Sequence, residues 1–113
     1  MKHQRKRVSK IVDELITYLF SIGATDINVN IQERLDDYKI SLRSNYTKDK
    51  NKKVYKLLKA LQTPKQEEIE EYYWELAGDS DVGTELSLIG MMIDKVEVDL
   101  NTDFLEIILY RNR

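Results

Sequence analysis

Three groups of residues have types and spacing that could do chemistry. Gly83 and Thr84 stand directly before an apolar helical segment, and a glycine turn at a helix start can bring backbone N–H groups close to a phosphate. Asp79 and Asp81 carry the oxygen ligands that Ca²⁺ prefers. The third group consists of lysines that could bind phosphate or nucleic acid, namely Lys48, Lys50, Lys52, Lys53, Lys56 and Lys59.

Each group also has a purely structural interpretation. Gly83 and Thr84 can be a loop glycine followed by a helix cap. The lysines are better explained as a solvated loop and a polar helix face, because no glycine cradle or run of stacking aromatic side chains accompanies them. They could also pair with the acidic residues between positions 67 and 75, within the chain or in a neighbouring molecule. Asp79 and Asp81 have too few companions for a Ca²⁺ loop, and Gly83 does not fall where an EF-hand requires its glycine.

The residue types on which many active sites depend are absent or single. The 113-residue chain has no cysteine, which excludes a disulfide framework, thiolate zinc sites, iron–sulfur clusters and cysteine nucleophiles. Its one histidine, His3, lies among the basic first residues, so a histidine triad or a multi-histidine metal site cannot form within one chain. We therefore expect no metal site.

Length and charge favour one soluble domain over residues 1–113. Residues 1–7 form a basic tip that is expected to fray, because cations at a helix start oppose the helix macrodipole. The formal net charge of -2 is too small to imply a charged partner. No apolar run is long enough to span a bilayer, and Asp13 and Glu14 interrupt the apolar segment that a signal peptide needs. We expect a cytoplasmic protein of bacterial type with no membrane partner.

The apolar pattern predicts the elements that must position these groups. Apolar residues from Val8 to Phe20 follow one helical face, and Gly23 suits a left-handed helix end. Alternation then predicts strands over residues 27–32 and 38–43, joined by a short turn into an antiparallel hairpin. Polar side chains alternate with the apolar ones at 27, 29 and 31, which predicts a half-buried strand in a sheet covered on one side only.

The second half of the chain also has the apolar spacing of helices followed by strands. Helical spacing returns at residues 54–61, and Thr63-Pro64 marks the start of a further, glutamate-rich helix. The segment after Thr84 is apolar nearly all round, which predicts a helix buried on more than one side. A strand over 96–100 precedes one from Phe104 to Tyr110 that is apolar on both faces and is expected to be central. The order predicts an α/β two-layer sandwich: a mixed sheet of two antiparallel hairpins covered by helices on one face.

Three segments of this order resemble the Bergerat-fold ATPase family, which includes histidine kinase ATPase domains, anti-sigma factor kinases and gyrase-type ATPases. The family's first helix carries Glu-Leu-x-x-Asn, and residues 14–18 read Glu-Leu-Ile-Thr-Tyr at that place. Its first hairpin ends in Asp-x-Gly-x-Gly, where residues 44–48 read Ser-Asn-Tyr-Thr-Lys. Its second glycine box, Gly-Thr-Gly-Leu-Gly-Leu, opens a helix, and residues 83–88 read Gly-Thr-Glu-Leu-Ser-Leu. The resemblance runs from roughly Val8 to Arg111 and lacks the family's leading strand.

The resemblance implies a degenerate nucleotide pocket. Tyr18 replaces the asparagine that holds Mg²⁺ in the family, and a phenol is a poor ligand for that cation. Ser44 replaces the aspartate that accepts a hydrogen bond from adenine, and Glu85 brings negative charge where phosphates would lie. Glu14 matches the general base, but a base without metal and phosphates has nothing to activate. The pocket that the resemblance implies consists of Glu14, Tyr18, Ser44, Asn45, Lys48, Gly83 and Thr84.

These departures favour a non-catalytic regulatory or protein-interaction module in signalling, with no cofactor and no catalytic residue. We expect a protein partner, or self-association through Phe104, Ile108 and Tyr110. The alternative is a divergent anti-sigma factor-like serine kinase or ATPase that binds ATP with Mg²⁺ and uses Glu14 as its base. Nucleic-acid binding through the lysines of residues 2–10 and 48–59 is a third hypothesis that we do not favour, and it would require affinity that falls steeply with salt.

Overall fold

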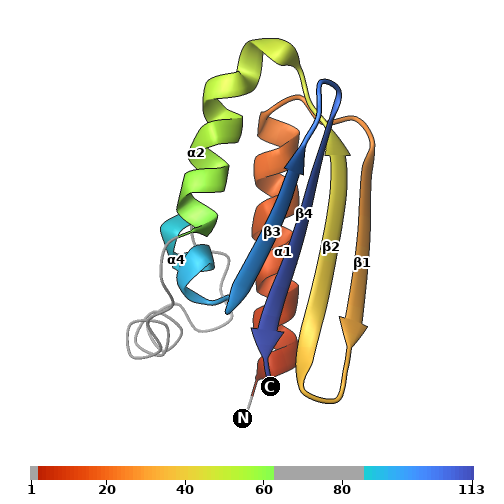
Figure 1. Cartoon of the computed structure of the whole chain (residues 1–113), viewed down its shortest axis with the longest axis vertical. Coiled ribbons are helices and arrows are strands. Elements are labelled where there is room, and N and C mark those ends of the chain that lie inside the picture. Colours follow the sequence, from red (N-terminus) through yellow and green to blue (C-terminus); the bar gives the residue numbers. More distant parts are fainter. Residues whose placement is uncertain (1–2, 63–85) are drawn as a thin grey trace.

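The strands form one antiparallel sheet with the spatial order β1-β2-β4-β3 (Figure 1). A computed structural model describes residues 3–62 and 86–113 of the chain. The strands are β1 (Ile27–Glu33), β2 (Asp37–Asn45), β3 (Lys95–Leu100) and β4 (Phe104–Asn112). Hairpins join β1 to β2 and β3 to β4, and the two hairpins meet through β2 and β4, which also run antiparallel. The predicted α/β class and the two hairpins are confirmed, whereas the prediction of a mixed sheet is wrong because the second strands of the hairpins run in opposite directions.

The described helices are α1 (Gln4–Ser21), the 3₁₀ turn η1 (Lys48–Lys50), α2 (Asn51–Leu61) and α4 (Leu86–Met91). They cover one face of the sheet, so the described part has two layers (Figure 1). Helix α1 begins before the predicted start at Val8, and Arg7 is already buried. The predicted glutamate-rich helix after Thr63 and the loop before Thr84 lie outside the described residues. None of the described helices is long and apolar enough to cross a membrane.

The end of α1 confirms the role that was predicted for Gly23. Gly23 has φ 88°, a left-handed conformation that glycine adopts at little cost. The Ala24 N–H donates to the Leu19 carbonyl and the Gly23 N–H to the Phe20 carbonyl, each at 3.1 Å. This pair of bonds is the Schellman motif, which satisfies carbonyls at the helix end. The chain then turns directly into β1.

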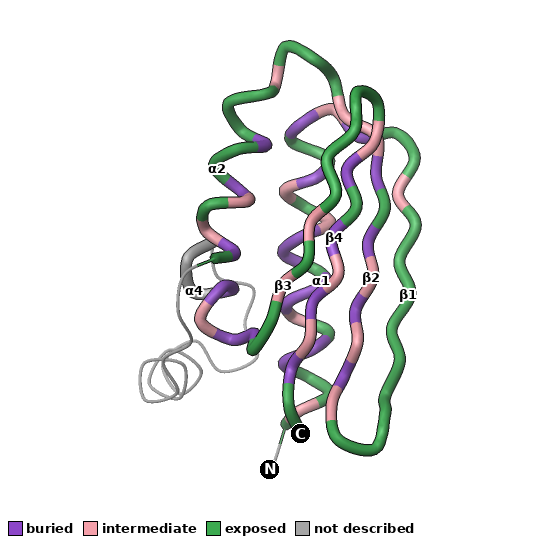
Figure 2. The backbone as a smooth tube through the Cα atoms, viewed as in Figure 1, coloured by how far each residue is buried: buried purple, intermediate pink, exposed green. Residues whose placement is uncertain are grey.

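The core lies between α1 and the two central strands. The side chains that β2 and β4 direct toward the helices are buried, whereas their neighbours along each strand are more exposed (Figure 2). On the same face of the sheet, beside α1, α2 and α4 contact each other (Figure 1). The buried residues of these layers include Ile11, Leu15, Leu19, Ile40, Leu42, Val54, Leu57, Ile89, Met92, Ile93, Leu105, Ile107 and Leu109. The predicted burial of the helix after Thr84 is therefore confirmed at Ile89, and the predicted central place of β4 is confirmed too.

Strand β1 is less buried than the two central strands. Val29 and Ile31 lie opposite Leu42 and Ile40 and therefore on the helix side of the sheet. They are nevertheless 37% and 48% exposed, whereas Leu42 and Ile40 are buried. The helical layer is centred on β2 and β4, so β1 projects beyond its cover (Figure 2). The apolar face of the predicted half-buried strand therefore lies on the helix side, as expected, but it is only partly covered at Val29 and Ile31.

Candidate functional site

Glu14, the predicted base, is part of a buried ion pair on α1. Its side chain is 6% exposed, and its Oε1 lies 3.0 Å from Nζ of Lys10, one turn earlier on the same helix. The Lys10 side chain is itself only 16% exposed. A buried carboxylate requires such a partner, because desolvation otherwise disfavours its charged form. The pair gives Glu14 a structural role on the face of α1 that it shares with Tyr18.

Tyr18 joins α1 to α2. It lies one turn after Glu14, and its hydroxyl donates a hydrogen bond of 2.7 Å to the Lys53 carbonyl oxygen. Burial raises the pKa of the Tyr18 phenol, so the hydroxyl keeps its proton at neutral pH. The Tyr18 hydroxyl thus serves as a hydrogen-bond donor between two helices.

Ser44 and Asn45 close the far end of the β1–β2 hairpin. The Asn45 Oδ1 accepts hydrogen bonds from the backbone N–H groups of Thr25 (2.8 Å) and Asp26 (3.0 Å). The Asn45 Nδ2 donates to the Thr25 Oγ1 at 2.8 Å. Ser44 is 1% exposed, and its hydroxyl donates to the Asn45 carbonyl at 2.7 Å. These contacts hold the segment between α1 and β1 against the end of β2.

The remaining predicted site residues are Lys48, Gly83 and Thr84. Lys48 is exposed at the start of η1, and Gly83 and Thr84 lie outside the described residues. Two surface hollows, each of about 310 Å³, lie elsewhere. One lies where α1 begins, between Arg5, Glu33 and Arg113, and the other lies on the sheet and includes Arg43 and Glu106. Residues 3–62 and 86–113 contain no group of three or more acidic, histidine or cysteine side chains that could hold a metal ion.

The sheet face opposite the helices carries the predicted self-association residues Phe104, Ile108 and Tyr110 together with charged side chains for which no role was predicted. We call it the open face, and it comprises the outward side chains of the four strands, including Lys39, Ser41, Arg43, Lys95, Glu97, Phe104, Glu106, Ile108 and Tyr110. The Arg43 guanidinium lies 4.5 Å from the centre of the Phe104 ring. The Tyr110 hydroxyl donates to the Glu97 carboxylate at 3.2 Å. Strand alternation places Arg43 on a polar face, but only the pairing of β2 with β4 shows what it contacts.

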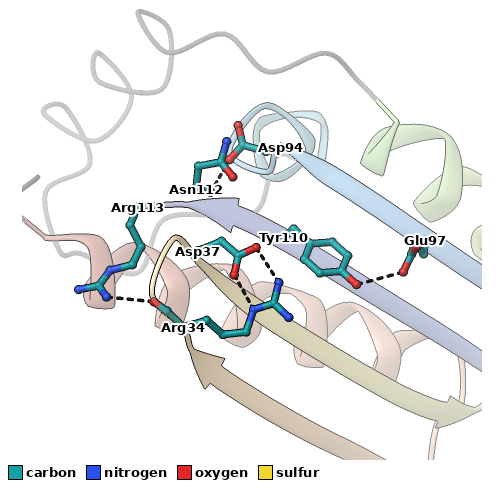
Figure 3. A network of polar contacts seen from close by, with 7 residues as sticks. All are labelled: Arg34, Asp37, Asp94, Glu97, Tyr110, Asn112 and Arg113. Carbon is teal, nitrogen blue, oxygen red and sulfur yellow. Dashed lines mark hydrogen bonds and ion pairs between the residues drawn. The ribbon is translucent and has the colours of Figure 1, made fainter.

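Ion pairs cluster where the β1–β2 turn meets the end of β4. Arg34 and Asp37 form two hydrogen bonds of 2.6 and 2.8 Å, and the Arg113 Nη1 donates to the Arg34 carbonyl at 3.0 Å (Figure 3). The hydrogen bond from Arg34 lowers the pKa of Asp37. Close by, a hydrogen bond from Arg5 lowers the pKa of Glu33. These groups are solvent-exposed and paired, so they organise the turn and leave no charge poised for proton transfer.

Comparison of the chain with protein-family models, with curated proteins and with solved structures found no match. A functional proposal therefore depends on the contacts and burial of the described residues.

Proposed function

We propose that this chain is a non-catalytic protein-interaction module. The observation that supports it best is that side chains of the predicted pocket make hydrogen bonds to other segments of the chain. The side-chain amide of Asn45 makes three hydrogen bonds to Thr25 and Asp26, and the Tyr18 hydroxyl donates to α2. A nucleotide that used these groups would have to replace these contacts, each of which contributes about 0.5–1.5 kcal/mol net.

The open face provides the surface for a partner. Phe104, Ile108 and Tyr110 are half-buried there and no helix of the described residues covers them, while Arg43 and Glu106 lie beside them. Aromatic residues and arginine are enriched in the centres of protein interfaces, where charged rims set the orientation. The resemblance to Bergerat-fold ATPases leads us to propose a regulatory role in signalling on a scaffold of that ancestry, with its nucleotide site lost.

Calorimetric titration with Mg-ATP tests the absence of a nucleotide site. We expect no heat of binding at millimolar nucleotide for the full chain. Asn45→Ala should lower the free energy of unfolding by about 1–3 kcal/mol, because up to three hydrogen bonds are lost. Micromolar binding that Glu14→Gln or Asn45→Ala weakens would overturn the proposal in favour of a divergent ATPase or kinase.

A further inference from the structure

Strand β1 is an edge of the described sheet, and its one charged residue, Glu33, stands at its last position and is paired with Arg5 and Arg113. Its residues from Ile27 to Gln32 alternate apolar and amide side chains and include no charge and no proline. Natural edge strands commonly carry lysine, proline or a bulge, which prevent pairing with another strand. The apolar side chains at positions 29 and 31 are more than one third exposed. An edge of this kind is suited to pairing.

The hydrogen bonds of the hairpin show which main-chain groups of β1 are free to pair. The Arg34 N–H donates to the Asp37 carbonyl, and the Asp26 carbonyl accepts from the Asn45 N–H. Because hydrogen-bonded pairs alternate along an antiparallel ladder, the even-numbered residues of this strand direct their N–H and C=O groups toward β2. The odd-numbered residues from Ile27 to Glu33 direct theirs away from the sheet.

We propose that β1 pairs with β1 of a second copy of this chain, antiparallel, about a two-fold axis at Asn30. Ile27 then lies opposite Glu33 of the second copy, and Val29 lies opposite Ile31. All four odd-numbered residues form hydrogen-bonded pairs, about eight bonds in total. The two sheets become one eight-stranded sheet with the helices of both copies on the same side.

This register is the one that matches side chains as well as main-chain groups. Apolar Val29 and Ile31 lie opposite each other twice, and Asn30 meets its own copy. Just beyond the strand ends, Asp26 lies opposite Arg34 of the second copy, which gives two symmetric pairs of opposite charge. A shift by two residues in either direction separates Asp26 from Arg34, and a shift by one residue would turn the apolar row to the other face.

The helix beside β1 contributes further apolar surface. Arg5 of α1 contacts Glu33 of β1, so this side of α1 faces β1. Ile16 follows Arg5 by about three helical turns, lies on the same side and packs partly buried against the core. The row of Val29 and Ile31 from both copies would therefore be covered between two α1 helices. The inference does not depend on the proposed function, since an active nucleotide site would leave β1 equally free.

A single cysteine tests the register, because the chain has no cysteine of its own. In the proposed pair the two Asn30 residues face each other at a position without hydrogen bonds, where Cα atoms lie about 4.5 Å apart, within disulfide range. Asn30→Cys should therefore form a disulfide-linked dimer under mild oxidation. Asn28→Cys is the matched control on the same strand face. Its two copies would lie four residues apart along the strand, roughly 13 Å, and should not cross-link.

Sedimentation over a range of protein concentrations tests the apolar contacts of β1 and the pairs of Asp26 with Arg34. Ile31→Lys should weaken the wild-type dimer at least about tenfold, because it places a charge in the apolar row. Ile108→Lys, on the open face, should leave the dimer unchanged. Asp26→Arg and Arg34→Asp should each weaken self-association roughly tenfold, and a mixture of the two variants should restore a one-to-one dimer.

Three results would overturn the inference: a wild-type chain that stays monomeric at millimolar concentration, equal cross-linking of Asn28→Cys and Asn30→Cys, or no recovery of dimer in the mixed charge variants. A dimer that Ile108→Lys dissociates and Ile31→Lys does not would place self-association on the open face instead. Circular dichroism of every variant distinguishes loss of pairing from loss of fold. None of these results depends on the nucleotide titration.

Discussion

At the scale of single residues, a few side chains connect segments that are distant in the sequence. The Asn45 amide holds the start of β1, and the Thr47 hydroxyl and N–H both donate to the Ile22 carbonyl at the end of α1. Gly23 lies between these contacts. Its position leaves no room for a side chain, because a Cβ there would meet the Thr47 Cγ2 at 2.6 Å and Oγ1 at 2.7 Å.

Gly23→Ala should destabilise the fold by about 1–3 kcal/mol. The left-handed conformation costs a residue with a Cβ about 1–2 kcal/mol, and the collision with Thr47 adds to it. Urea unfolding measures the loss. The same substitution in a Thr47→Ala background should cost less, because the colliding atoms are gone. Equal unfolding midpoints for wild type and Gly23→Ala would contradict this account of the turn.

At the scale of elements, α2 is held both by apolar contacts and by Tyr18. Val54, Leu57 and Leu61 of α2 are buried in the core, which suits the amphipathic pattern of the helix. The hydrogen bond from Tyr18 to the Lys53 carbonyl fixes the first turn of α2 against α1. A helix of only 11 residues depends on such tertiary contacts for its stability.

Tyr18→Phe should cost about 0.5–1.5 kcal/mol of stability at neutral pH, the usual net value of one hydrogen bond. Burial raises the pKa of Tyr18, so its protonated form is favoured in the folded state. The contribution of Tyr18 is therefore fully present below the ordinary tyrosine pKa of about 10 and is lost as the pH rises through the higher folded value. Thermal unfolding of both proteins should show a gap that is constant up to pH 10 and shrinks above it. A gap that does not change with alkaline pH would refute this role.

At the scale of the whole molecule, the helical layer does not match the width of the sheet. Helix α1 packs over β2 and β4, and α2 packs with α4. Strand β1 is left at the edge with its apolar side chains half in solvent. Because the described helices do not extend over β1, this strand can pair with another sheet. The open face, which no described helix covers, can bind a different partner.

Ile40 and Ile31 lie directly opposite each other on neighbouring strands. They therefore test whether the helices cover β2 but not β1. Ile40 is 0% exposed and Ile31 is 48% exposed. Ile40→Ala should cost about 2–5 kcal/mol through lost burial and a cavity, whereas Ile31→Ala should cost less than about 1 kcal/mol. Chemical unfolding at low micromolar protein keeps self-association out of the comparison. Similar losses for both variants would show that the helical layer covers β1.

The sequence predicts which residues belong to the candidate site, but it does not predict what their side chains contact. The sequence places Glu14 and Tyr18 on one helix face, because they are four residues apart. It does not show that Tyr18 donates to a carbonyl 35 positions away or that Asn45 binds a loop 19 and 20 positions earlier. Such contacts depend on how the elements pack, and local spacing carries no information about packing partners.

Local sequence patterns predict the type and order of the described helices and strands, the end of α1 at Gly23, the burial of Ile89 in α4 and the central place of β4. Each of these follows from apolar spacing or from backbone chemistry within a few residues. The packing of the elements was needed to show that the described sheet is wholly antiparallel, that β1 lies beyond the described helices and that Tyr18 and Asn45 make hydrogen bonds within the fold. Apolar alternation shows which side of a strand avoids water, but the neighbouring layer decides whether that side is covered.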